Sequence, residues 1–237
     1  MRFREHSGAG VIGDGLVVKT KTTGGVVAGP VFVGVFTVLG ARRAGYDWRR
    51  HAVSSLAVGR DGWGQRANFM LAGGLYCVAG RGLARSSTRV VGPPVVPVLV
   101  FAAGMGLIGS GAFVTDPVAG FPPENPAANA VAAIAELAPT RSGQLHNFCA
   151  IPIFGGLPVA ALIGAGSAVR RHEDRWAAYC AASSIGMASA CALFGAAFGG
   201  VPTLVARGGL FQRLSIATGF GWLSALSFRA LRPSSQS

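Results

Sequence analysis

Residues 148–169 read FCAIPIFGGLPVAALIGAGSAV, and this stretch decides the fold. It holds 22 residues without a charged side chain. A helix needs about 20 mostly apolar residues to cross the apolar layer of a bilayer. Pro152 and Pro158 do not exclude such a helix, because neighbouring helices can satisfy the backbone groups that proline frees. The stretch therefore predicts a transmembrane helix.

Five further apolar stretches have a similar length. Hydrophobic residues make up 51% of the chain and charged residues only 13%, against about 25% in soluble domains. The 36 glycines suit close contact between helices in lipid. We therefore predict an all-α, polytopic membrane bundle of about six helices. Besides Phe148–Val169, the expected spans are Gly25–Ala41, Ala67–Leu83, Pro94–Val114, Trp176–Gly200 and Phe211–Leu231.

The expected domain organisation is a flexible basic tail over residues 1–23, a transmembrane domain over 24–232 and a short tail over 233–237. No removable signal peptide is recognised, so the first apolar run is expected to act as an anchor. With an even number of spans, the face that carries both termini collects 12 Lys and Arg, against 9 on the other face. The positive-inside rule then predicts a cell-membrane protein with both termini in the cytoplasm.

The formal net charge of +12 does not indicate a nucleic-acid partner, because the basic residues stand between apolar runs. That arrangement fits membrane loops, and membrane lipids are the expected partners. The four cysteines lie in or beside apolar runs and form no Cys-x-x-Cys pair, which excludes a disulfide framework or a zinc knuckle.

Two loops on the face opposite the termini, Arg42–Arg66 and Thr115–Asn147, hold most of the polar groups of chemical interest. Within the second loop, Asn125 suits a helix N-cap and Pro126 the first helical position. We predict a short helix over Pro126–Leu137 that lies at the membrane interface.

Polar residues at the ends of the spans form the candidate site. Arg66, Gln212 and Arg213 stand at helix starts and are candidate ligand-binding residues. A cation at a helix N-terminus opposes the macrodipole, so an anion should lie nearby. The two candidates are Asp116, with which Arg213 would form an ion pair, and an anionic lipid headgroup.

Two catalytic interpretations remain open beside the plain one, in which these residues are ordinary helix ends. His51, Asp116 and His146 would hold zinc with an open water position, although a site without any cofactor is the simpler expectation. Ser54 or Ser55 would instead be a nucleophile with a histidine base. The candidate catalytic residues are therefore Ser54, Ser55, Asp116 and His146.

The order of these motifs resembles a bacterial membrane family, domain of unknown function 998. The resembling stretches are Tyr46-Asp47, His51 to Leu56, Gly62-Trp63, Asn68-Phe69, Thr115 to Pro117, Gly120 to Pro122, Gly143 to His146 and Gln212-Arg213. The resemblance implies a compact bundle of about six helices without a characterised activity. It gives weight to Ser54, Asp116, His146 and Arg213 as polar positions of the family.

Three functions follow as alternatives: binding of a lipid or small amphiphile at the outer mouth of the bundle, hydrolysis at an Asp/His site, or a structural role without a small-molecule site. In the first two, Asp116, His146 and Arg213 should converge at the mouth, with His51, Ser54 or Ser55 folding over them.

Overall fold

The computed structural model describes residues 9–122 and 139–232, and within them the chain is helical. The long helices are α1 (Ala9–Arg42), α2 (Trp63–Leu83), α4 (Val95–Ala112), α7 (Arg141–Ile151), α8 (Leu157–Val169), α9 (Asp174–Phe198) and α10 (Gly208–Leu231). The short ones are α3 (Thr88–Val91), the 3-10 turns η1 (Ser54–Ala57), η2 (Arg60–Gly62) and η4 (Val205–Arg207), and the π-helical turn η3 (Pro152–Gly156). The expected all-α class is confirmed.

Several helices begin earlier than the hydropathy pattern predicts. In three of them, the expected starts at Ala67, Phe148 and Phe211 become Trp63, Arg141 and Gly208. The first two turns of these three helices carry Gln65, His146 and Gln212, all of which are buried. Hydropathy cannot mark a helix start whose polar side chains face the interior. Helices α7 and α8 join through η3 into one helical run over Arg141–Val169.

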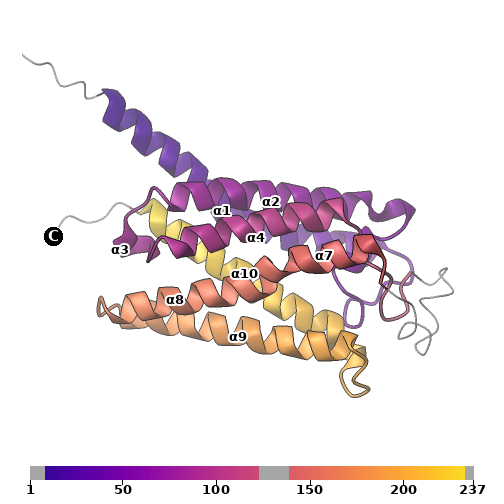
Figure 1. The fold of residues 1–237 in the computed structure, drawn as a ribbon. Coiled ribbons are helices and arrows are strands. Elements are labelled where there is room, and N and C mark those ends of the chain that lie inside the picture. The colour runs from indigo at the N-terminus through magenta and orange to yellow at the C-terminus, as the bar shows by residue number, and fades with distance from the viewer. Residues whose placement is uncertain (1–8, 123–138, 233–237) are drawn as a thin grey trace, which may run out of the picture.

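In the described part of the chain, six helical rods pack into a closed ring. Figure 1 shows these helices lying lengthwise beside one another. Their order is α1, α2, α4, α7 with α8, α9 and α10, and α10 packs against α1 to close the ring. Neighbouring rods run in opposite directions. The bundle therefore has the N-terminal part of α1 and the end of α10 at the same end. The loops 43–62, 113–122 and 199–207 lie at the other end, which we call the loop end.

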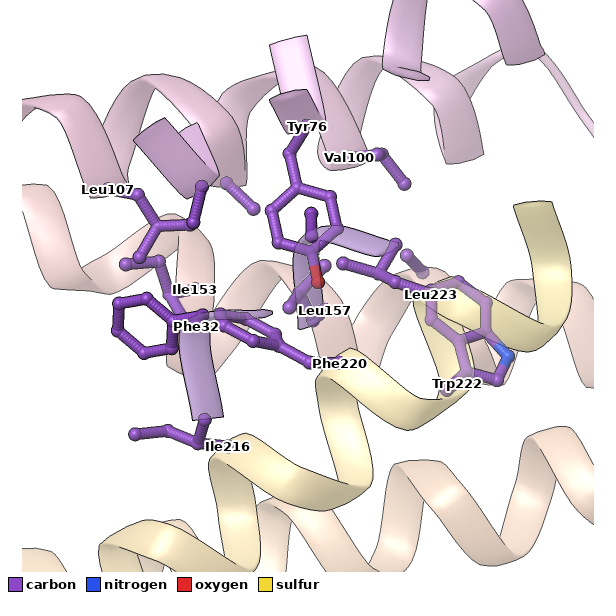
Figure 2. Packing of buried hydrophobic residues seen from close by; sticks show 14 of the residues in the cluster. Phe32, Tyr76, Val100, Leu107, Ile153, Leu157, Ile216, Phe220, Trp222 and Leu223 are labelled. Carbon is purple, nitrogen blue, oxygen red and sulfur yellow. The ribbon is translucent and has the colours of Figure 1, made fainter. Parts of the chain in front are cut away.

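The interior of the ring is apolar and aromatic (Figure 2). Phe220 of α10 lies edge-on to Phe32 of α1 and to Tyr76 of α2, with ring centroids 5.3 and 5.1 Å apart. Trp222 and Leu223 extend this core toward the C-terminal end of α10. Complete burial of such large side chains fixes how the rods pack, because side-chain packing contacts hold helices together in lipid.

Among the described residues, four helices are long and apolar enough to cross a membrane by length and composition: Thr22–Arg42, Val95–Ala112, Arg141–Val169 and Asp174–Phe198. Their outward faces are apolar as well, since Phe148, Leu162 and Ile185 are each more than half exposed. Large apolar side chains exposed along whole helices indicate contact with lipid. The chain therefore has the features of an integral membrane protein.

Two further expectations concern the ends and the long loop. The predicted interfacial helix over Pro126–Leu137 lies outside the described residues and stays a prediction. Helix α1 begins at Ala9, inside the segment expected to be a flexible tail, and its first turns project beyond the bundle (Figure 1).

Candidate functional site

A buried loop closes the bundle at the loop end. Residues 51–58, HAVSSLAV, connect α1 to α2, and every one of them is buried. A buried loop must find partners for its backbone polar groups, because an unpaired buried N–H or C=O is costly. Here side chains of α10 and of the preceding residues supply several of those partners.

The segment just before the buried loop caps the start of α10 with backbone carbonyls. The N–H groups of Gly209 and Leu210 donate to the carbonyls of Arg50 and Arg49, at 3.1 and 2.9 Å. The first N–H groups of a helix have no partner within the helix, so these bonds satisfy two of them. We call residues 48–51 the carbonyl cap.

Arg213 binds the carbonyl cap with its guanidinium group. Its Nη1 donates to the carbonyls of Trp48 and His51, at 2.6 and 3.2 Å, and to that of Gly209. Its Nη2 donates to the hydroxyl of Tyr46. The group also lies over the rings of Phe36 and Tyr46. The unfavourable cation at this helix start is therefore offset by carbonyl dipoles and aromatic faces.

Neighbouring amides and hydroxyls complete the attachment of the buried loop. The side-chain oxygen of Gln212 accepts a hydrogen bond from the Val53 N–H at 2.7 Å. The Tyr46 hydroxyl donates to the Ala52 carbonyl at 3.0 Å. On α2, Asn68 Nδ2 donates to the Phe32 carbonyl and to Gln65 Oε1, linking α2 to α1. Gln212 thus binds the protein's own backbone, and its expected role in ligand binding stays a prediction.

The expected ion pair between Asp116 and Arg213 does not form. The Asp116 carboxylate accepts from the Thr140 N–H at 3.1 Å and from the Thr140 hydroxyl at 2.6 Å. Thr140 in turn caps α7 by accepting from the Gly143 N–H. A carboxylate beside a helix N-terminus is stabilised by the macrodipole, so Asp116 serves α7 and leaves Arg213 to the carbonyl cap.

Arg66 also binds a carbonyl. Its Nε donates to the Gly111 carbonyl at 3.0 Å, in the last turn of α4. A cation there meets the negative end of the α4 dipole. Like Gln212, Arg66 has a partner within the protein, and its expected role in ligand binding stays a prediction.

His146 and Ser54 line one small interior cavity beneath the buried loop. Its volume is about 30 Å³, and Phe69, Ser110 and Gln212 are among its other lining residues. His146 Nδ1 hydrogen-bonds the Phe113 carbonyl at 2.9 Å, so this nitrogen carries the proton. The space fits one water molecule. Ser55 is buried outside this lining, and its hydroxyl has no hydrogen-bond partner among the described residues.

The His51 ring is engaged with backbone, because its Nδ1 accepts from the Asp47 N–H at 2.9 Å. Within the described residues, no three His, Cys, Asp or Glu side chains form a metal-binding group. The proposed set of His51, Asp116 and His146 is divided between the carbonyl cap and the start of α7.

The engaged ring predicts acid sensitivity. Burial, with the neighbouring Arg50, holds the pKa of His51 below its usual range. A depressed histidine pKa means that the unfolded chain binds the proton more readily, so stability increases with pH in this range. The contribution should be complete above about pH 6.5 and be lost as the pH falls below it. Protonation also removes the acceptor for Asp47, worth about 1 kcal/mol.

Unfolding in detergent at pH 8 and pH 5 tests this. His51→Asn should lose much of the pH dependence of the melting temperature, because asparagine does not titrate. His172→Asn is the matched control, since His172 is exposed and its φ of 58° suits asparagine. An unchanged pH dependence in His51→Asn would contradict the prediction.

The sequence did not identify two residues as part of the site at the loop end, although both stand in stretches that resemble the family. Tyr46 joins the carbonyl cap to Arg213, and the fully buried Phe121 packs between the two loops. The Phe121 ring lies 5.3 Å from that of Tyr46 and 5.2 Å from that of His51. The sequence signal for both residues was an aromatic side chain within an otherwise polar loop.

A groove runs along the outside of the bundle between α1 and α10. Its volume is about 490 Å³. Its walls are the apolar or small side chains Val33, Phe36, Thr37, Gly40, Ala41 and Ala217. Arg43, Tyr46, Trp48 and Arg213 line it toward the loop end. The groove is therefore apolar along the helices and cationic where they meet the loops.

Comparisons with known proteins bear on the whole chain. No curated protein and no solved structure matches it. The sequence profile described as a protein of unknown function (DUF998) matches residues 26–229, which include all six helical rods and the buried loop. The chain belongs to this family.

Proposed function

We propose that this chain is a six-span membrane protein that binds an anionic amphiphile in the groove between α1 and α10. The observation that supports it is the chemistry of that groove: apolar helix walls of about 490 Å³ that end at two arginines, a tyrosine and a tryptophan. Ligand pockets commonly have volumes of about 300–1,000 Å³ with a few oriented polar groups. Acyl chains fit the walls, and Arg213, whose charge no carboxylate among the described residues pairs, attracts an anionic head.

The proposal counts α2 and α10 as spans. They have 21 and 24 residues, long enough to cross the apolar layer. Their lower hydropathy comes from buried polar residues such as Gln65 and Gln212, which face the ring interior and not lipid. Both termini would then lie on one side, proposed as the cytoplasmic side because of its basic loops.

Binding is favoured over the hydrolytic alternative by the interior cavity. Ser54 and His146 share it, but its volume of about 30 Å³ admits a water molecule and no ester. The groove, by contrast, lies on the side of the bundle where lipid chains would reach it.

Filling the groove tests the proposal. Thr37 and Ala217 are exposed and line it, so Thr37→Trp and Ala217→Trp should occupy the space of an acyl chain. We expect retention of phosphatidylglycerol, measured by native mass spectrometry after release from mixed-lipid nanodiscs, to fall about tenfold, the equivalent of about 1.4 kcal/mol.

The matched control is Val38→Trp, at an exposed position adjacent to Thr37 that does not line the groove. It should retain the lipid like the wild type. Equal retention in all three variants would show that the groove does not bind the amphiphile. Equal loss of phosphatidylcholine would show that an anionic head is not recognised.

A further inference from the structure

A second cavity, separate from the groove, lies on the other side of Arg43. Its volume is about 540 Å³, and it lies between the end of α1, the turn η2 and the segment Phe121–Pro122. Three arginines and one aspartate line it: Arg42, Arg43, Arg60 and Asp61. We call it the basic cavity.

Arg43 is fixed in the wall of the basic cavity. Its Nη2 donates to the Val58 carbonyl at 2.9 Å, and its Nη1 pairs with the Asp61 carboxylate at 3.1 Å. The group also lies over the buried Phe121 ring, 5.6 Å from the centroid. The Asp61 charge is therefore used by Arg43, while the Asp61 side chain itself stays largely exposed.

Arg42 and Arg60 keep their charges unmatched. Neither guanidinium has an ion-pair or hydrogen-bond partner among residues 9–122 and 139–232. The cavity thus holds three cations and one carboxylate. Like charges lining one concave surface repel each other and concentrate a positive potential there, which attracts an anion.

The helix macrodipoles explain only part of this arrangement of positive charges. Arg42 stands in the last turn of α1, where the macrodipole favours a cation. Arg60 stands in η2, directly before the first turn of α2, where the macrodipole disfavours one. An anion bound beside Arg60 would offset this unfavourable cation.

We propose that the basic cavity binds a phosphate group through Arg42 and Arg60. Two free guanidinium groups offer the forked donors that match phosphate oxygens. The ligand is either the headgroup of an anionic phospholipid or a soluble phosphate compound. The site needs no acyl chain, so it does not depend on the groove being occupied.

The experiment uses the full chain in phosphatidylcholine nanodiscs. In one arm, sodium phosphate is titrated against sodium chloride at constant ionic strength, and the melting temperature is followed. In the other arm, phosphatidylglycerol replaces part of the phosphatidylcholine without added phosphate, and every protein carries Thr37→Trp so that the groove is already filled. Stabilisation by phosphate identifies a soluble ligand, and stabilisation by phosphatidylglycerol alone identifies a lipid headgroup.

The variants Arg42→Gln and Arg60→Gln should each weaken binding about tenfold, and the double variant should abolish it, since each removes a charge-assisted contact. Arg141→Gln and Arg207→Gln are the controls, because both arginines are exposed at the loop end outside the basic cavity. They should change affinity less than about twofold.

Three outcomes would overturn the proposal: no stabilisation in either arm, full binding by the double variant, or equal weakening by the control variants. Thr37→Trp separates this site from the groove. Phosphate binding should survive in this variant. Failure of the groove proposal would therefore not affect the proposal for the basic cavity, and failure of the basic-cavity proposal would not affect the groove.

Discussion

Replacing Arg213 with glutamine should lower the free energy of unfolding by about 3 kcal/mol, because a hydrogen bond to a charged group contributes about 1.5–3 kcal/mol and this residue makes several. The guanidinium holds the Trp48 and His51 carbonyls and the Tyr46 hydroxyl at once. Glutamine is too short and has too few donors to replace it. Unfolding in detergent, followed by tryptophan fluorescence, measures the loss.

Three further variants separate the causes. Arg207→Gln, an exposed arginine near the same helix start, should change stability by less than about 0.5 kcal/mol. Arg213→Lys keeps the charge but not the forked donors, so it should recover only a minor part of the loss. Tyr46→Phe combined with Arg213→Gln should be less harmful than the sum of the two, since they share a bond. Additive losses and full rescue by lysine would both contradict the carbonyl-cap account.

The sequence identified the helices but not the partners of their polar ends. Uncharged runs such as 148–169 predicted the helix positions, because lipid exposure and core burial both select apolar residues. Arg66 and Arg213 were expected to meet anions, since charge is the visible property of a side chain. In the structure both donate to carbonyls. Every residue has a carbonyl, so sequence pattern alone does not reveal which of them will be the acceptor.

The buried loop illustrates the same limit. Residues 51–58 were assigned to the loop Arg42–Arg66, which lies between two apolar spans and was singled out for its polar groups. Their own side chains are small or apolar apart from His51 and two serines, and this was the available signal for burial. The bond from Val53 to Gln212 joins residues 159 positions apart. Such a pairing depends on ring closure between α1 and α10, which one sequence does not specify.

The sequence predicted that the candidate site residues lie at one end of the bundle, but the contacts that it predicted between them differ from those in the structure. His51, Ser54, Asp116, His146 and Arg213 all lie at the loop end, as the ends of the spans predicted. Asp116 caps α7 through Thr140, while Arg213 binds the carbonyl cap. The single cluster that the sequence predicted is therefore two separate sets of hydrogen bonds. One set holds loop 43–62 to α10, and the other holds loop 113–122 to the start of α7. Which of these residues contact a ligand stays a prediction.

The close approach of the carbonyl cap to α10 makes Gly209 sensitive to one added methyl group. A Cβ at Gly209 would overlap the His51 carbonyl oxygen and lie 2.7 Å from that of Trp48. Both atoms are backbone and accept hydrogen bonds from Arg213, so they cannot move aside without breaking those bonds. Gly209→Ala should therefore destabilise the protein by about 3 kcal/mol, at the upper end of the usual cost of overpacking.

Gly221→Ala is the matched control on the same helix. Gly221 is exposed in the middle of α10, and a Cβ there meets no atom within 4 Å. Alanine should stabilise α10 at that position by about 0.5–1 kcal/mol, because glycine loses more backbone entropy in a helix. The two substitutions are chemically identical, so helix propensity cannot account for opposite signs. Opposite signs in detergent unfolding would place the cost of Gly209→Ala in the contact with the carbonyl cap. Equal stabilisation by both variants would show that the cap does not hold the start of α10 closely.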